Sequence, residues 1–214
     1  MNAKLFGALG SGSCAIELAL AELGVHYDVV NIDLGGGQQR EADYRDINPQ
    51  RKIPALVDPD GFVLTESVAI LISLCERYPH ANLLPPIGKN ERAQALRWLL
   101  FVATELYPLV EINDYPQRFT PAHSMPTGSD RADATREIAR HLWRERWLIV
   151  EDQVGAGPYL LGEDACVTDF YIAVVSRWAQ QEVWRPDNLP NIERLTATVA
   201  ERPMCKNIWQ KHFV

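Results

Sequence analysis

Residues 47–71 read INPQRKIPALVDPDGFVLTESVAIL, and this stretch predicts much of the first half of the fold. The part IPALVDPDGFVL has two short apolar runs around the turn Pro-Asp-Gly at 59–61, a composition typical of a β-hairpin. The chain that follows, TESVAILISLCERYP, predicts a helix with Thr65 as its N-cap and Pro79 as its stop. We therefore expect a hairpin followed by one helix.

The residues before this stretch predict a strand, a helix and a second strand. KLFGAL at 4–9 is a short apolar run, and a helical apolar pattern follows over 16–23. YDVVNIDL at 27–34 predicts the second strand, whereas the polar, glycine-led residues 35–50 predict a loop with a short irregular helix. The first part of the chain is thus a small βαβ-ββα unit.

Beyond a proline-rich connection the strand pattern disappears. The longer predicted helices span 91–112, 131–154 and 167–183, and two shorter ones follow near the C-terminus. The division that this pattern predicts is an α/β domain at 1–80, a linker at 81–90 and an all-helical domain at 91–214.

The amino-acid composition and charge indicate which classes of partner to expect. The chain has 214 residues, 47% of them hydrophobic, and a net charge of −7 with acidic and basic residues interspersed. Nucleic acids and anionic membranes are bound through clustered Lys and Arg, so we expect neither as a partner. The four cysteines show no spacing typical of a metal site, and their use fits a cytoplasmic protein: Cys14, Cys75, Cys166 and Cys205.

The N-terminus has some features of an export signal. Its apolar run ends near Cys14, as in a lipoprotein box, but Ser11 stands where such a box needs an aliphatic residue. Glu17 and Glu22 also interrupt the apolar run, which an export signal excludes. We interpret residues 1–20 as mature protein, and no stretch is apolar for long enough to predict a membrane span.

Residues 10–18, GSGSCAIEL, allow several interpretations. Gly10, Gly12 and Ala15 match a dinucleotide-binding turn, with Asp33 at the spacing of a ribose-binding acid. Such a fold needs further parallel βα units, which this chain lacks, so we do not favour that interpretation. A second alternative is a helix start in which Ser11 or Ser13 is an ordinary N-cap and Cys14 is a buried small residue.

A third alternative concerns thiol chemistry. Ser11 and Cys14 have the spacing of a CxxC motif in which Ser replaces the first cysteine, the one that meets substrate. A helix N-terminus stabilises anions, including thiolates. Ser11 cannot be the thiolate itself, but its hydroxyl can donate a hydrogen bond to a thiolate that another molecule supplies. For Ser13 and Cys14 we keep the capping and packing interpretation.

Two downstream motifs fit this thiol hypothesis. Pro54 opens an apolar strand, and a cis Ile53-Pro54 bond would leave the backbone of Ile53 able to pair with a peptide-like ligand, although an ordinary turn proline explains the stretch as well. Glu66 and Ser67 open a helix, where they can hold an ammonium group and a carboxylate, or simply cap it. A thiol, a peptide backbone and an amino-acid head group together describe glutathione.

At this point the chain resembles the soluble, cytosolic glutathione transferase superfamily, from about Lys4 to the C-terminus. Residues 47–71 are similar to the family pattern NPxxxIPxL followed by ES, and residues 11–14 resemble the Ser-x-Pro-Cys of the serine-type theta and delta classes. PYLLGEDACVTDFYIAV and LPNIERLTATVAERPMCKNIW resemble two conserved segments of the helical half. The resemblance implies a thioredoxin-like N-terminal domain, an all-α C-terminal domain, glutathione as cosubstrate and a homodimer.

The resemblance also implies roles for single residues. Ser11 would donate its hydroxyl to the glutathione thiolate, and Ile53 before cis-Pro54 would pair with the cysteinyl backbone. Glu66 and Ser67 would hold the γ-glutamyl group. A further set of positively charged residues would hold the glycyl carboxylate: Lys52, supported by Arg40 or Arg51.

The match to the beta class is weaker. Glu105 and Tyr107 resemble its ELH segment, where the neighbouring subunit can reach the site, but Tyr replaces His. Alignment to the catalytic cysteine of that class places Gly12 there, without a side chain. Cys166 replaces the Ser or Thr that usually caps the helix before Asp169, so we expect a cap that is weakened or rebuilt from Thr168.

The predicted activity is that of a detoxifying glutathione S-transferase without a metal. The bound thiolate would attack a small hydrophobic electrophile in a pocket between the domains, lined by the first loop and the first long helix: Ala8, Leu9, Leu106, Tyr107 and Val110. The alternatives are a glutathione-binding or regulatory protein without catalysis, and a glutathione-dependent peroxidase or thiol reductase that uses Cys14.

Overall fold

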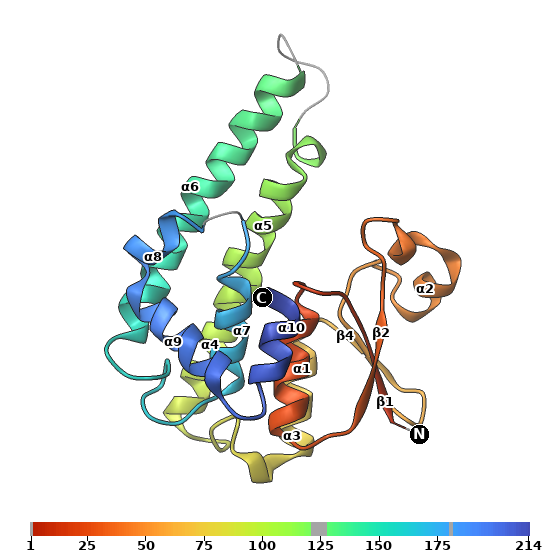
Figure 1. The fold of residues 1–214 in the computed structure, drawn as a ribbon, viewed down its shortest axis with the longest axis vertical. Coiled ribbons are helices and arrows are strands. Elements are labelled where there is room, and N and C mark those ends of the chain that lie inside the picture. Colours follow the sequence, from red (N-terminus) through yellow and green to blue (C-terminus); the bar gives the residue numbers. More distant parts are fainter. Residues whose placement is uncertain (1, 121–127, 180–181) are drawn as a thin grey trace.

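The computed structural model describes residues 2–120, 128–179 and 182–214, and its N-terminal part contains the predicted sheet (Figure 1). The elements of this part are β1 (Ala3–Gly7), α1 (Ser13–Glu22), β2 (Tyr27–Asn31), η1 (Gln38–Arg40), α2 (Ala42–Ile47), β3 (Ala55–Val57), β4 (Val63–Thr65), α3 (Ser67–Arg77) and η2 (Pro79–Ala81). The predicted βαβ-ββα order is confirmed.

The four strands form one sheet in the order β2-β1-β3-β4. β1 pairs in parallel with β2, which requires the crossover through α1, and β3 runs antiparallel to both β1 and β4. The hairpin between β3 and β4 turns at Gly61, whose φ of 88° lies in the left-handed region that favours glycine. The predicted turn at 59–61 is therefore confirmed.

Helix α1 lies between the sheet and the helical half of the protein (Figure 1). It contacts α3 on one side and α7 and α10 on the other. Every residue from Ser13 to Leu20 is buried, so the helix is enclosed all round, as its mostly apolar composition requires. Burying each large aliphatic side chain, such as Ile16, contributes roughly 1.5–3 kcal/mol.

The rest of the described chain is helical. Its elements are α4 (Asn90–Phe101), the π-helical segment η3 (Val102–Leu106), α5 (Tyr107–Asp114), η4 (Pro116–Arg118), α6 (Gly128–Val154), α7 (Val167–Val175), α8 (Trp184–Asn188), α9 (Pro190–Glu201) and α10 (Lys206–Phe213). The predicted helix at 91–112 is continuous through α4, η3 and α5. The helix predicted over 167–183 ends earlier, at Val175, and Ala179 has a left-handed φ of 62° that a continuing helix excludes.

The start of α3 differs from the prediction. Thr65 is the last residue of β4, where it pairs with Ala55, and Glu66 is the N-cap in its place. Glu66 has φ 67° and ψ 115°, a backbone conformation that is rare and costly for a residue with a Cβ. The strand therefore passes into the helix through one strained residue rather than through a threonine cap.

The start of α7 is held by a buried carboxylate. Asp169 accepts hydrogen bonds from the backbone N–H of Leu160 at 2.8 Å and of Cys166 at 2.7 Å. Burial raises the pKa of Asp169 to about 6, although these hydrogen bonds oppose the rise. The expectation that Thr168 rebuilds the cap is wrong, because its hydroxyl donates to the carbonyl of Ala95 on α4 instead.

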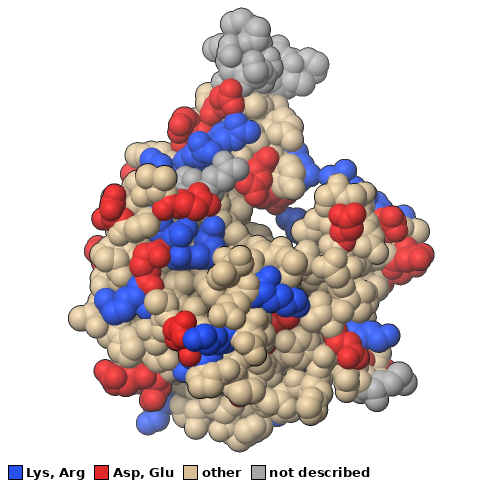
Figure 2. Space-filling model, viewed as in Figure 1, with Lys and Arg blue, Asp and Glu red and all other residues tan. Residues whose placement is uncertain are grey.

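The surface carries both charges side by side. On the face shown in Figure 2, Lys and Arg alternate with Asp and Glu, so neither sign forms a continuous patch there. Among the described residues, no helix has the length and apolar character that a membrane crossing needs.

Asp169→Ala is expected to lower the free energy of unfolding by about 3 kcal/mol or more, because each buried N–H left without an acceptor costs about 1–3 kcal/mol. Urea unfolding followed by tryptophan fluorescence, at a pH well above that at which Asp169 titrates, measures the change. Asp164→Ala removes an exposed carboxylate nearby and is the control. Equal stability of the two variants would contradict this role of Asp169.

Candidate functional site

The strand register brings the three predicted motifs to one edge of the sheet. Phe6 of β1 pairs with Ala55 of β3, and Ala55 pairs with Thr65 of β4. These three paired residues lie at the strand ends that lead to the motifs. The loop Ala8–Gly12 follows β1, Ile53-Pro54 precedes β3, and Glu66-Ser67 follows β4. Motifs that are far apart in the sequence therefore lie side by side.

The hydroxyl of Ser11 is engaged within its own loop. It donates to the carbonyl of Ala8 at 2.7 Å, lies 3.0 Å from the Ser13 hydroxyl and accepts from the Ser13 N–H at 3.3 Å. Ser13 is fully buried and fills the space where Gly7 lacks a side chain, so it locks the loop against β1. To donate to a ligand, the Ser11 hydroxyl must first turn away from Ala8.

Gly12 is the N-cap of α1 and faces three side chains from other elements. A methyl group on Gly12 would lie 3.2 Å from the Tyr107 hydroxyl, 3.6 Å from the Ser67 hydroxyl and 3.7 Å from the Trp178 ring. The Gly12 N–H has no hydrogen-bond acceptor among the described residues. Beside Gly12 there is thus a small space bordered by two hydroxyls, an indole ring and the N-terminus of a helix.

Two side chains from the C-terminal part fasten this loop through Gly10. The Trp178 indole N–H donates to the Gly10 carbonyl at 2.8 Å, and the Gly10 N–H donates to His212 Nδ1 at 3.1 Å. His212 Nε2 then lies 2.8 Å from the buried carboxylate of Glu17. Because Nδ1 accepts, Nε2 carries the proton that is given to Glu17. Sequence reasoning missed Trp178 and His212, since nothing local relates them to the loop.

The Ile53-Pro54 peptide bond is cis, as predicted. The preceding residue is held by two donors, because the Tyr44 hydroxyl and the Asn48 amide both donate to the Lys52 carbonyl, at 2.8 and 2.6 Å. The N–H and C=O of Ile53 have no partner within the part of the chain that the structure describes. The backbone of Ile53 is therefore available to pair with a ligand as a neighbouring strand would.

Glu66 and Ser67 stand at the start of α3, next to this edge. Ser67 is almost fully buried and close to Tyr107 and Tyr171, whereas the Glu66 side chain is exposed. Residues in strained backbone conformations are common at ligand-binding sites, so the left-handed φ of Glu66 adds to the functional interpretation of this pair.

Lys52 spans the opening between the two halves of the protein. Its ammonium group lies 2.9 Å from Glu111 Oε2 on α5, and Arg118 pairs with the other oxygen of Glu111 at 3.3 Å. Arg40, at the end of η1, and Arg51, next to Lys52 in the chain, are both exposed. In this structure Lys52 therefore already holds a carboxylate of the protein.

The two residues taken from the beta-class resemblance have different surroundings. Glu105 pairs with Arg146 of α6 at 2.8 Å, so within this chain its carboxylate is held away from Gly12. Tyr107 reaches Gly12, and its ring packs edge-on against Trp178 with centroids 5.0 Å apart. Burial and the charges of Glu66 and Glu111 raise the pKa of Tyr107 to about 12.

Cys14 is fully buried, and burial together with the negative charge of Glu17 raises the pKa of its thiol far above the ordinary value. Cys75, Cys166 and Cys205 are likewise buried, with raised pKa values caused first by burial. All four are free thiols. None of them has the low pKa and exposure of a reactive cysteine.

The residues expected around an electrophile differ in exposure. Leu9 is 60% exposed within the loop, whereas Leu106 is completely buried and does not present its side chain to a ligand. Leu106 ends the π-helical segment η3, and Pro108 lacks the N–H that a regular helix would use at this point. This irregularity sets the direction in which Tyr107 projects.

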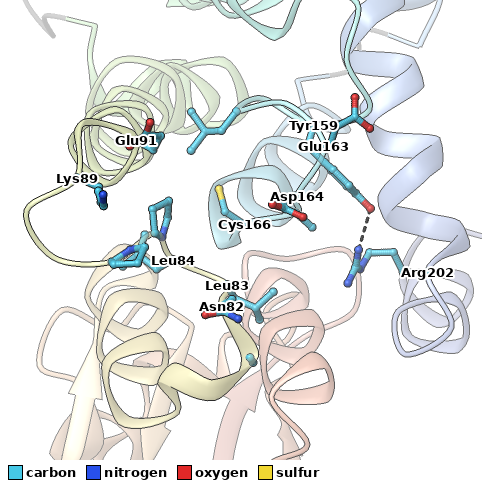
Figure 3. A pocket seen from close by; sticks show the side chains of 15 residues that line it. Asn82, Leu83, Leu84, Lys89, Glu91, Tyr159, Glu163, Asp164, Cys166 and Arg202 are labelled. Atoms are coloured by element: carbon cyan, nitrogen blue, oxygen red, sulfur yellow. Dashed lines mark hydrogen bonds between the residues drawn. The ribbon is translucent and has the colours of Figure 1, made fainter.

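A cavity lies elsewhere, at the connection between the two halves (Figure 3). Its volume is about 740 Å³, and Asn82, Leu83, Cys166 and Arg202 are among its lining residues. Arg202 there donates to the Tyr159 hydroxyl at 2.8 Å, the contact drawn in Figure 3. The cavity shares no lining residue with the site around Gly12. Among the described residues there is also no cluster of His, Cys, Asp or Glu that could hold a metal ion.

Residues 1–72 match the family model for the glutathione S-transferase N-terminal domain. The chain is 29% identical to glutathione S-transferase GstA of Escherichia coli O157:H7, with 94% of each protein aligned. It is 30% identical to glutathione S-transferase F10 of Arabidopsis thaliana, over 79% of this chain and 77% of the relative.

A solved structure supports the fold. A glutathione transferase homolog from Sulfitobacter, determined with bound glutathione, has a TM-score of 0.88 to this chain at 24% identity, covering 100% of this chain and 99% of that one. The predicted combination of a thioredoxin-like N-terminal domain with a helical C-terminal domain is therefore confirmed.

A thiol-specific reagent is expected to react slowly with every cysteine of the folded protein, because all four are buried, and to titrate four thiols in denaturant. Stopped-flow absorbance measures both rates. Leu9→Cys places a thiol at an exposed position of the loop and serves as the fast-reacting control. Rapid labelling of Cys14 in the native wild type would contradict this picture of the site.

Proposed function

Because the chain belongs to the glutathione S-transferase family, we propose that it binds glutathione beside Gly12 and activates its thiol for attack on a small hydrophobic electrophile. The observation that carries this proposal is the row Phe6, Ala55 and Thr65, which places a helix N-terminus, a cis-proline edge and a strained helix cap around one space. Each of these three features suits a different part of glutathione.

The peptide part of glutathione fits the cis-proline edge. The N–H and C=O of Ile53, next to cis-Pro54, pair with the backbone of the cysteinyl residue as an added strand would. Glu66 binds the γ-glutamyl ammonium group, and Ser67 with the first N–H groups of α3 binds its carboxylate.

The glycyl carboxylate of glutathione binds Lys52, and Arg40 or Arg51 supports this contact. Glutathione would then replace Glu111 as the partner of Lys52, and Arg118 would still hold Glu111. One ion pair is exchanged for another, so the net cost of opening the Lys52 contact is small. Because Lys52 is well exposed, the exchange does not require a buried charge to be released.

The thiol part lies at the N-terminus of α1. An ordinary thiol with a pKa of about 8.5 is only a few per cent ionised at neutral pH, so lowering its pKa by about two units makes the thiolate the main form. Each unit corresponds to roughly 1.4 kcal/mol. The Gly12 N–H and the helix dipole supply part of this, and Ser11 contributes a hydrogen bond if its hydroxyl turns from Ala8.

In the reaction, the thiolate sulfur donates an electron pair to an electrophilic carbon, and the leaving group departs with the electrons of the broken bond. The proton lost by the thiol goes to solvent. Leu9 and Trp178 give the electrophile an apolar surface next to the sulfur. We also propose that the protein forms a homodimer. Its location would be a reducing cytoplasm, where all four cysteines stay thiols.

A glutathione-binding protein without turnover is the second candidate, because the binding groups alone would support it. A reductase that uses its own Cys14 is disfavoured by the complete burial of that thiol. Conjugation assays with a panel of electrophiles separate these functions: turnover supports the transferase, and tight binding without turnover across the panel would contradict it.

Ser67→Ala is expected to weaken glutathione binding about tenfold or more, because a hydrogen bond to a charged group contributes roughly 1.5–3 kcal/mol. Isothermal titration calorimetry with glutathione measures the change. Ser73→Ala, farther along α3, is the matched control and should bind as the wild type does. Wild-type affinity in Ser67→Ala would contradict the proposed position of the γ-glutamyl group.

A further inference from the structure

We propose that the hydroxyl of Tyr107 donates the hydrogen bond that stabilises the glutathione thiolate, and that the sulfur packs against Gly12, where any side chain would crowd it. This inference rests on the proposed function and assigns the central role to a residue of the helical half. It makes Tyr107 a catalytic residue, since its hydroxyl touches the reacting sulfur.

The first reason is the position of the hydroxyl. An added methyl on Gly12 would lie 3.2 Å from it, so the hydroxyl faces the open side of Gly12 and can reach a sulfur that packs against this glycine. The same place is bordered by the Ser67 hydroxyl and by Trp178, and it lies at the positive end of the α1 dipole. A sulfur atom here would meet the hydroxyl and the dipole at once.

The second reason is that the Tyr107 hydroxyl has nothing else to bind. Within the described residues it has no hydrogen-bond partner, and Tyr107 is only half-buried, so a ligand can reach the hydroxyl. The hydroxyl can therefore donate to a ligand without first breaking a hydrogen bond within the protein. Ser11 differs in this respect, because its proton is already donated to Ala8 at 2.7 Å.

The third reason is that Tyr107 is held rigidly. Its ring packs at 82° to Trp178, which is itself fixed by its hydrogen bond to Gly10. It follows the π-helical segment directly, and Pro108 comes next in the chain. π-helical segments inside α-helices are frequent at functional sites.

The charge state of Tyr107 suits a donor. The groups that face it are Glu66 at the start of α3, Glu111 on α5 and Tyr171 on α7. Burial and the two carboxylates keep its pKa near 12, so the phenol stays protonated at neutral pH. It therefore donates to the thiolate rather than removing the proton, which passes to solvent when the thiol ionises.

Tyr107→Phe is expected to raise the pKa of bound glutathione by about one unit, which lowers the thiolate fraction about tenfold below that pKa. Ultraviolet difference spectra of the complex against pH measure the thiolate directly, and kcat/KM against pH measures its use. Phe keeps the ring packing on Trp178, and unfolding curves check that the variant is folded.

The controls separate this inference from the proposed function. Tyr115→Phe removes an exposed hydroxyl at the far end of α5 and should leave the pH profile unchanged. Ser11→Ala should shift the thiol pKa less than Tyr107→Phe does. An unchanged profile in Tyr107→Phe, or the full shift in Ser11→Ala, would overturn the role of Tyr107 alone. Failure of the wild type to bind glutathione would overturn the proposed function together with it.

Gly12→Ala tests the position of the sulfur. Gly12 has φ −61° and ψ −15°, so alanine fits its backbone, and the added methyl enters the proposed sulfur space. We expect glutathione to bind about tenfold more weakly, which corresponds to about 1.4 kcal/mol. Gly35→Ala, whose methyl would meet only the Asp33 carboxylate at 3.5 Å, is the control. Unchanged binding in Gly12→Ala would place the sulfur elsewhere and overturn the inference.

Discussion

The N-terminus of α1 is fixed in space because the helix is buried on every side, and the site depends on this constraint. The sheet and α3 enclose one side, and α7 with α10 enclose the other. The loop that leads into the helix is fastened at Gly10 by Trp178 and His212, two residues from the last quarter of the chain. A helix end held this firmly can direct its N–H groups and dipole at a ligand without moving.

The two halves of the protein contribute different chemistry to the site. The α/β half supplies backbone edges and caps that suit the peptide and head group of glutathione. The helical half supplies Tyr107 and Trp178, which border the space beside Gly12. In this arrangement Gly12 leaves room for the glutathione sulfur, and Tyr107 of the helical half provides the hydroxyl. A glycine at the start of α1 is therefore compatible with activation of the thiol.

Much of the fold could be predicted from the sequence, because it depends on local patterns. The hairpin turn at 59–61 can be predicted from a few neighbouring residues, whereas the cis bond before Pro54 is implied by the family resemblance and not by its neighbours alone. The surroundings of Ser11 could not be predicted, because its hydroxyl donates to a carbonyl whose direction depends on the folded loop. The proximity of Gly12 to Tyr107 and Trp178 joins residues more than 90 positions apart, and Leu106 is buried where a helical pattern allowed exposure. Such long-range relations have no local signal in one sequence.

In the proposed complex, the glutathione sulfur lies beside Gly12, within reach of the Tyr107 hydroxyl. A crystal structure of the protein with glutathione measures this position directly. We expect a sulfur within hydrogen-bonding distance of the Tyr107 hydroxyl and next to the Gly12 N–H, with Ser11 still bound to Ala8. A sulfur bound to a reoriented Ser11 hydroxyl and out of reach of Tyr107 would contradict it.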